Sequence, residues 1–330
     1  MNYNTHIQNL KTNFSNLDLL KELDFEYFFN NEDFAKSCIN ICVDLCNKAS
    51  EKLKINLNFG VLLNYKFNAS VGVKEKKSYI IFNLGFINRW ETIISDSVEL
   101  FCRENIAKLT ISDNEKNKLK SILNECCISY LFYHELAHIL QLSDTKTNNT
   151  YDFQEQSSTN NLFDIKKHIY EIDADHFGSI MSTVRLLEKL MDSNNQLNPI
   201  SLFNYLTALL FTTSNMIIEF SQKSFQEIYY KKNSHPHPLI RIMGCKEQIL
   251  EIVSKNLQIQ HPLLLSILER TGTMLSQIQY SNGRIVDYPK LHQEHFKEIE
   301  TYNDEIEEEN KLYKELVRFK SQDFFNNLYK

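Results

Sequence analysis

Residues 116–142 read KNKLKSILNECCISYLFYHELAHILQL, an apolar stretch that contains neither glycine nor proline. Ser112 and Glu115 stand just before it at the spacing of a capping box, which is typical of a helix start. The whole chain is poor in helix-breaking residues, with seven Gly and five Pro among 330 residues. We therefore expect one long helix here and long helices as the main component of the fold.

A small β-sheet is expected before this helix. Residues 55–73, INLNFGVLLNYKFNASVGV, and residues 78–87, SYIIFNLGFI, are short runs rich in β-branched and aromatic side chains. They predict two or three strands, which would form the chain's only sheet. The expected fold class is mainly α with a small β-sheet (α+β), with the long helix packed on the sheet.

The rest of the chain divides into helices and one polar loop. Further helices are expected at 17–54, at 164–191, from Asn198-Pro199 onward, at 239–255, and in an apolar and a charged segment beyond 261. The polar segment 143–161 lacks apolar periodicity and is predicted to be a surface loop. We expect an N-terminal helical segment at 1–54, a core at 55–255 and a C-terminal helical extension at 256–330.

Composition excludes several classes of protein. The net charge of −6 argues against nucleic acid as a partner, because phosphate binding needs a basic surface. The N-terminus has no secretory signal pattern, and the most apolar stretch, 202–220, contains Glu219 and several amides and hydroxyls, which favours a buried helix over a membrane span. Seven cysteines without an export signal suggest reduced thiols in the cytoplasm.

Three of these cysteines, Cys38, Cys42 and Cys46, share one face of the predicted helix 17–54. Three thiolates in such a row could bind a metal. Free cysteine is, however, among the most buried residue types, so packing in the core is the favoured interpretation.

The motif that carries chemistry is His134-Glu135-Leu136-Ala137-His138. On a helix, His134 and His138 point to one side, so both imidazoles can bind one zinc ion. Glu135 lies beside the first ligand and can take a proton from a zinc-bound water as a general base. The alternative is a pair of hydrogen-bonded core histidines without a metal.

A catalytic zinc needs a third protein ligand. Glu171 is the favoured candidate, with Asp175 one turn later to accept the outer N–H of a ligand histidine. Asp144, six residues past His138, competes for this position, but that geometry needs a glycine where Gln141 stands. The remaining candidates for the third ligand are Asp173, His168 and His176.

The pattern HExxH followed by ExxAD on a later helix resembles the gluzincin zinc metallopeptidases, in particular the CAAX-prenyl-protease and HtpX-type branch. Flanking features of that branch also have counterparts at Asn68-Ala69, at Gly85-Phe86-Ile87, and at His235-Pro236 with Arg241 six residues beyond His235. The resemblance spans roughly residues 55–245. It implies a hydrolase with one zinc ion, a protein or peptide substrate bound along the strand near Asn68 and Ala69, and Arg241 as a supporting residue.

The family spacing also suggests His235 as a second donor to the developing oxyanion, with His237 as the competing candidate. Because the chain shows neither membrane spans nor an export signal, it looks more like the soluble phage-exclusion peptidase Lit and its relatives, which cut a host protein in antiviral defence. We expect a cytoplasmic zinc endopeptidase whose substrate and activating partner the sequence does not identify. The rival hypothesis is a non-catalytic helical interaction protein with a structural zinc or none.

Overall fold

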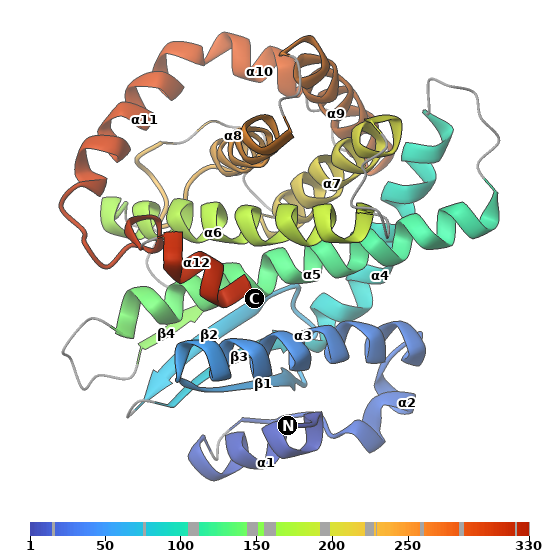
Figure 1. Ribbon diagram of the computed structural model, residues 1–330, viewed down its shortest axis with the longest axis vertical. Helices are drawn as coiled ribbons and strands as arrows, with labels where there is room; N and C mark the ends of the chain where they lie inside the picture. Colours follow the sequence, from blue (N-terminus) through green and yellow to red (C-terminus); the bar gives the residue numbers. More distant parts are fainter. Residues whose placement is uncertain are drawn as a thin grey trace.

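The computed structural model places most of the 330 residues. The described residues are 1–14, 17–74, 77–104, 112–143, 151–154, 163–191, 199–221, 228, 230–257, 261–283, 287–320 and 322–329. They form a mainly helical protein with one small sheet, as the sequence predicts (Figure 1).

The sheet has four strands, β1 (Asn56–Leu62), β2 (Ala69–Lys74), β3 (Lys77–Asn83) and β4 (Tyr151–Gln154), in the order β1-β3-β2-β4. β1 runs parallel to β3, whereas β2 is antiparallel to both β3 and β4. The fourth strand comes from the polar segment that the sequence predicts to be a loop. That prediction is wrong at 151–154, because four residues are too few to show a strand pattern.

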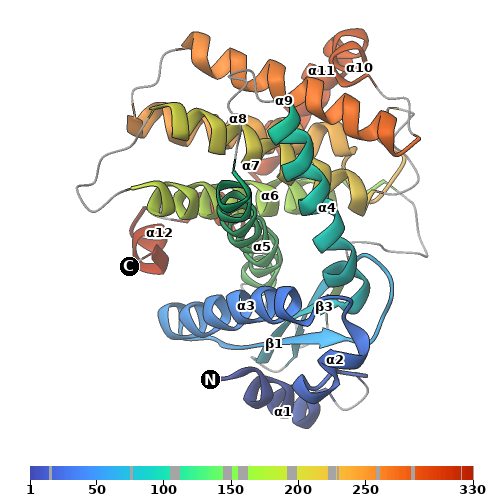
Figure 2. The same ribbon diagram turned by 90° about the vertical axis from the view of Figure 1, so that its right-hand side faces the viewer.

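The long helix α5 (Asp113–Ser143) packs against β2 and β3 and crosses α6 (Ile165–Leu190) in close contact (Figure 2). The predicted capping box is present: the Glu115 carboxylate accepts a hydrogen bond from the Ser112 backbone N–H at 2.8 Å, and the Ser112 hydroxyl accepts one from the Glu115 N–H at 3.3 Å. Asp164 caps α6 by accepting a hydrogen bond from Lys166 N. The close packing of α5 on α6 brings the HExxH motif next to the ExxAD motif.

The N-terminal segment wraps the sheet. α1 (Tyr3–Asn13) and α3 (Glu32–Leu53) both pack on β1, and between them come η1 (Glu22–Asp24) and α2 (Phe25–Phe28). The prediction of one helix over 17–54 is therefore wrong before Glu32. Cys38, Cys42 and Cys46 are buried on α3, and burial raises the pKa of Cys38 and Cys46 to about 12. The three thiols pack in the core, as predicted.

Helix α4 (Leu84–Arg103) begins directly after β3, so Gly85, Phe86 and Ile87 form a helical turn and not the predicted end of a strand. An apolar run of this length fits a buried strand or a buried helix equally well, which explains the error. Gly85 is needed at this point, because a Cβ there would lie 2.1 Å from the Tyr65 carbonyl oxygen.

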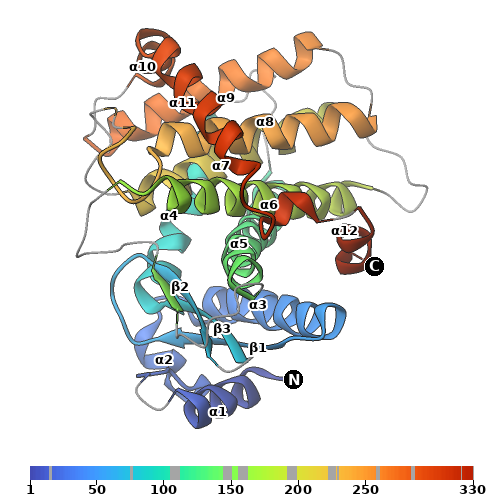
Figure 3. The same ribbon diagram turned by 90° about the vertical axis from the view of Figure 1, so that its left-hand side faces the viewer.

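Most of the remaining helices lie on the side of α6 away from the sheet, and the last one packs on α3 (Figure 1). They are α7 (Pro199–Phe220), α8 (Pro238–Leu257), α9 (His261–Ser281), α10 (Tyr288–Glu294), α11 (Phe296–Asn310), η2 (Val317–Phe319) and α12 (Gln322–Tyr329). Figure 3 shows α9, α10 and α11 arching over α8 before the chain returns to α6 at η2. Among the described residues, no helix is both long and apolar enough to cross a membrane.

Candidate metal centre

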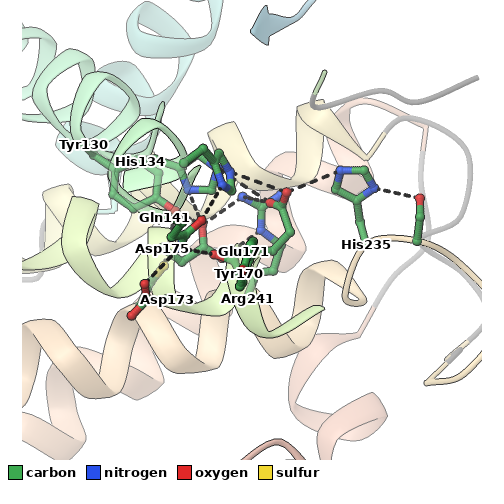
Figure 4. Close-up of polar contacts among 12 residues, drawn as sticks. Tyr130, His134, Gln141, Tyr170, Glu171, Asp173, Asp175, His235 and Arg241 are labelled. Atoms are coloured by element: carbon green, nitrogen blue, oxygen red, sulfur yellow. Dashed lines mark hydrogen bonds and ion pairs between the residues drawn. The ribbon is translucent and has the colours of Figure 1, made fainter. Parts of the chain in front are cut away.

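Three side chains converge where α5 meets α6. His134 and His138 project from α5, and their Nε2 atoms lie 3.2 Å apart. The carboxylate of Glu171 on α6 lies opposite them, 3.6 Å from His134 Nε2 and 3.5 Å from His138 Nε2 (Figure 4). All three side chains are buried.

This geometry fits a metal ion. A tetrahedral ion with ligand distances of about 2.0–2.1 Å places neighbouring ligand atoms about 3.3 Å apart. The three observed separations, 3.2, 3.5 and 3.6 Å, lie close to that value. Glu171 Oε2 is buried and receives no hydrogen bond from the described residues, so it is available as a ligand atom. A simple pair of core histidines would not need a buried carboxylate facing both nitrogens, so this group could hold a metal ion.

Asp175 supports the first histidine. Its Oδ1 lies 3.0 Å from His134 Nδ1, so Nδ1–H can donate to the carboxylate while Nε2 keeps its lone pair for a metal. Arg241 donates two hydrogen bonds to Asp175, both at 2.8 Å, and the Tyr130 hydroxyl donates a third at 2.6 Å. Burial alone would raise the pKa of Asp175, but Arg241 and His134 hold it well below its usual range. Asp175 therefore stays charged behind His134.

Arg241, which the resemblance implies as a supporting residue, directs its guanidinium to Asp175. Arg241 Nη2 also lies 3.7 Å from Glu171 Oε2. Arg241 thus places one positive charge beside two buried carboxylates of the site.

Gln141 supports the second histidine, a contact that the sequence analysis missed. Its Oε1 lies 3.0 Å from His138 Nδ1, and its Nε2 donates to the Tyr170 carbonyl at 3.1 Å and to Asp173 Oδ2 at 2.8 Å. Because Gln141 follows His138 by three residues on a helix, the spacing alone could have indicated the contact. Asp173, a competing candidate for the third ligand, faces Gln141 and lies outside the ligand group.

Of the two histidines in the His-Pro cluster, His235 lies nearer the candidate ligands. Its Nε2 is 3.5 Å from Glu171 Oε1, and 23% of its side chain is exposed. Ser234 Oγ lies 3.1 Å from His235 Nδ1 (Figure 4). His237 is buried and accepts a hydrogen bond from the Leu239 backbone N–H at 3.1 Å, where α8 begins. His235 therefore lies beside a candidate ligand, whereas His237 caps the start of α8.

Glu135 is buried on α5 directly after His134 in sequence, with 1% of its surface exposed. Its neighbours in sequence, His134 and Leu136, are fully buried as well. The predicted base thus lies in a region shielded from water, where its charge acts more strongly than on the surface.

The predicted substrate strand does not have a free edge. Asn68 and Ala69 are buried, and β2 pairs with β3 on one side and with β4 on the other. The pairing with β4 covers Ser70 to Val73, so β2 has no open edge there along which the expected substrate could bind. β4 ends that side of the sheet among the described strands.

The two histidines of α6 lie away from the ligand atoms. His168 contacts Asn233 O and the Tyr302 hydroxyl, and neither His168 nor His176 belongs to the candidate metal group. Asp144, which also competes for the third position, lies outside the described residues.

Comparison of the chain with protein-family models, with curated proteins and with solved structures found no match.

Proposed function

We propose that this protein is a zinc-dependent endopeptidase of gluzincin type that hydrolyses peptide bonds of a protein substrate. The observation that carries the proposal is the convergence of His134, His138 and Glu171 within 3.2–3.6 Å. The two histidines lie on α5, the helix that also carries Glu135. Two imidazoles and one carboxylate leave a fourth position open, which is the arrangement of catalytic rather than structural zinc sites.

A zinc ion held by these three residues would supply Lewis acidity, which lowers the pKa of a coordinated water and polarises a carbonyl group. The protein's own part begins with orientation. Asp175 accepts a hydrogen bond from Nδ1–H of His134 and so directs Nε2 of the same ring toward Glu171. Arg241 keeps Asp175 charged and thereby holds His134 in this tautomer.

Glu135 is the proposed general base. A carboxylate adjacent to the first ligand can accept a proton from the attacking water and pass it to the leaving amine. Its burial keeps bulk water from competing for that proton.

His235 is the proposed second donor to the developing oxyanion. Its Nε2 approaches Glu171 from the rim of the site, and it is more exposed than the three candidate ligands, so a substrate carbonyl can reach it. It acts by donating a hydrogen bond from Nε2.

The test compares newly formed protein N-termini in cells that express the wild type or Glu135→Gln. Glutamine keeps the size of the side chain but cannot accept the proton. Because general base catalysis contributes about 10²–10⁴-fold, cleavage should fall by at least that factor while purified Glu135→Gln still binds zinc. Equal cleavage by both proteins would reject the peptidase and favour the non-catalytic interaction protein.

We further propose a cytoplasmic role in antiviral defence, in which the enzyme cuts a host protein. This finer proposal is supported only by the resemblance of the zinc-binding motifs to the phage-exclusion peptidases. The same experiment tests it if cells are compared before and after phage infection. Cleavage of one host protein that appears only on infection is the expected result, and infection-independent cleavage would contradict it.

A further inference from the structure

We infer that Gln141 and Asp173 are positioning residues for the ligand His138, and that the C-terminal segment at Val317 and Arg318 holds Asp173 in place. The inference rests on the metal centre of the proposed function. It adds a second support, independent of Asp175, and gives the C-terminal extension a part in the site.

The first step concerns the amide of Gln141, which is fully buried. One end of this amide contacts the Tyr170 carbonyl and the Asp173 carboxylate, and both of these groups only accept hydrogen bonds. That end must therefore be the NH₂ group. The amide oxygen is left facing His138 Nδ1, so Nδ1 must carry the hydrogen, and Nε2 keeps the lone pair that a metal requires.

The second step concerns Asp173, whose side chain is fully buried. Besides Gln141, it accepts hydrogen bonds from Val317 N at 2.7 Å, from Arg318 N at 3.0 Å and from Arg318 Nε at 3.1 Å. A buried carboxylate is tolerated only with such donors and an opposite charge nearby. Three of its four donors come from η2, so the position of Asp173 depends on the C-terminal segment.

The two aspartates of the sequence Asp173-Ala174-Asp175 thus have separate tasks. Residues two apart on a helix do not share a face, so the carboxylates point in different directions. Asp175 contacts His134 directly, whereas Asp173 reaches His138 through Gln141. Each ligand histidine has its own buried acidic support from α6.

The experiment measures metal binding by the purified full chain. Zinc affinity is obtained by competition with a coloured chelator, and the visible absorption of the Co²⁺-loaded protein reports ligand geometry. Gln141→Met keeps the volume but removes both polar ends of the amide. Asp173→Asn removes the charge. Each change should weaken zinc binding by about 10–100-fold and alter the cobalt spectrum, because the hydrogen bond that orients a ligand is lost.

Combining the two changes separates this inference from general destabilisation. If Asp173 acts through Gln141, the double variant should bind zinc no more weakly than the weaker single variant. The matched control is Glu188→Gln, a carboxylate-to-amide change on the exposed side of the same helix, which removes the charge that pairs with Arg185. It should keep wild-type zinc affinity and the wild-type cobalt spectrum.

Several outcomes would overturn the inference. Wild-type affinity and spectrum in Gln141→Met, or additive losses in the double variant, would do so while leaving the proposed function intact. If Asp173→Asn does not fold, Arg318→Ala replaces it, since it removes one donor from Asp173, and an unchanged affinity would again contradict the inference. A wild-type protein that binds no metal would reject both this inference and the proposed function.

Discussion

At the scale of single residues, His235 and His237 differ most clearly in what their side chains contact. His235 Nε2 lies 3.5 Å from Glu171, whereas His237 accepts the Leu239 N–H at the start of α8. His235→Ala should lower kcat by about 10²–10³-fold with zinc content unchanged, as loss of an oxyanion donor does. His237→Ala should keep kcat near the wild-type value but lower the free energy of unfolding by about 1 kcal/mol, as loss of a helix cap does.

Steady-state kinetics on a peptide spanning the identified cleavage site, with bound zinc measured in each protein, checks this pair. Wild-type kcat in His235→Ala would remove His235 from the mechanism. A large loss of kcat in His237→Ala would show that the two assignments are reversed.

Asp175 offers a second prediction at this scale. Asp175→Asn keeps the shape of the side chain but removes the charge that faces His134 and Arg241. We expect zinc affinity to fall by about 10–100-fold, because the tautomer and direction of His134 are no longer enforced. Chelator competition measures the change, with Glu188→Gln on the exposed side of α6 as a control. Equal affinities in wild type and Asp175→Asn would contradict the assignment.

At the scale of elements, the site depends on how closely α5 approaches α6. A Cβ at Gly178 would lie 2.7 Å from the Tyr130 carbonyl oxygen, which is closer than real contacts allow. Gly178 follows Glu171 by about two turns of α6, and Tyr130 precedes His134 by about one turn of α5. A methyl group at position 178 would therefore push the candidate ligands on the two helices apart. Gly178→Ala should destabilise the fold by about 1–3 kcal/mol and weaken zinc binding.

Gly244 provides the matched control on α8, because a Cβ there would meet nothing within 4 Å. Gly244→Ala should stabilise the protein by roughly 0.5–1 kcal/mol, since alanine favours the helix more than glycine. Urea unfolding and zinc titration of both variants are the measurements. A Gly178→Ala protein as stable as Gly244→Ala would show that the helix contact is not tight.

The sequence predicted some helix boundaries correctly but not every element. Asp164 and Pro199 mark the starts of α6 and α7 as expected, because caps and prolines act locally. α4 and β4 were missed, since an apolar run does not reveal its partner and four residues carry no period. For a similar local reason, the HExxH and ExxAD spacings predicted which three side chains meet in the group that could hold a metal ion. The Gln141 contact with His138 follows from their spacing, but the position of Asp173 could not be predicted, because it depends on Val317, 144 residues further along the chain.

At the scale of the whole molecule, the C-terminal extension is joined to the site through α6. The Tyr302 hydroxyl of α11 contacts His168 Nδ1 at 2.5 Å, and the Tyr170 hydroxyl donates to Glu315. Arg318 makes a third contact of this kind by donating a hydrogen bond to Asp173. The segment that the sequence suggests as an appendage to the core therefore contacts the helix that carries Glu171 at three separate points.

Two histidines at this junction make the whole fold sensitive to acid. Burial lowers the pKa of His168, and burial together with the nearby Arg318 charge lowers that of His176 to about 4. In the unfolded chain both titrate near 6.5, so the unfolded state binds protons first as the pH falls. Protonated His168 also cannot accept the Tyr302 hydrogen bond.

The free energy of unfolding should therefore be highest above about pH 6.5 and decrease toward pH 4. Urea unfolding of the zinc-free protein at several pH values measures this decrease, which should be shallower in His176→Gln. Identical pH dependence in the wild type and this variant would mean that His176 already titrates normally in the folded protein.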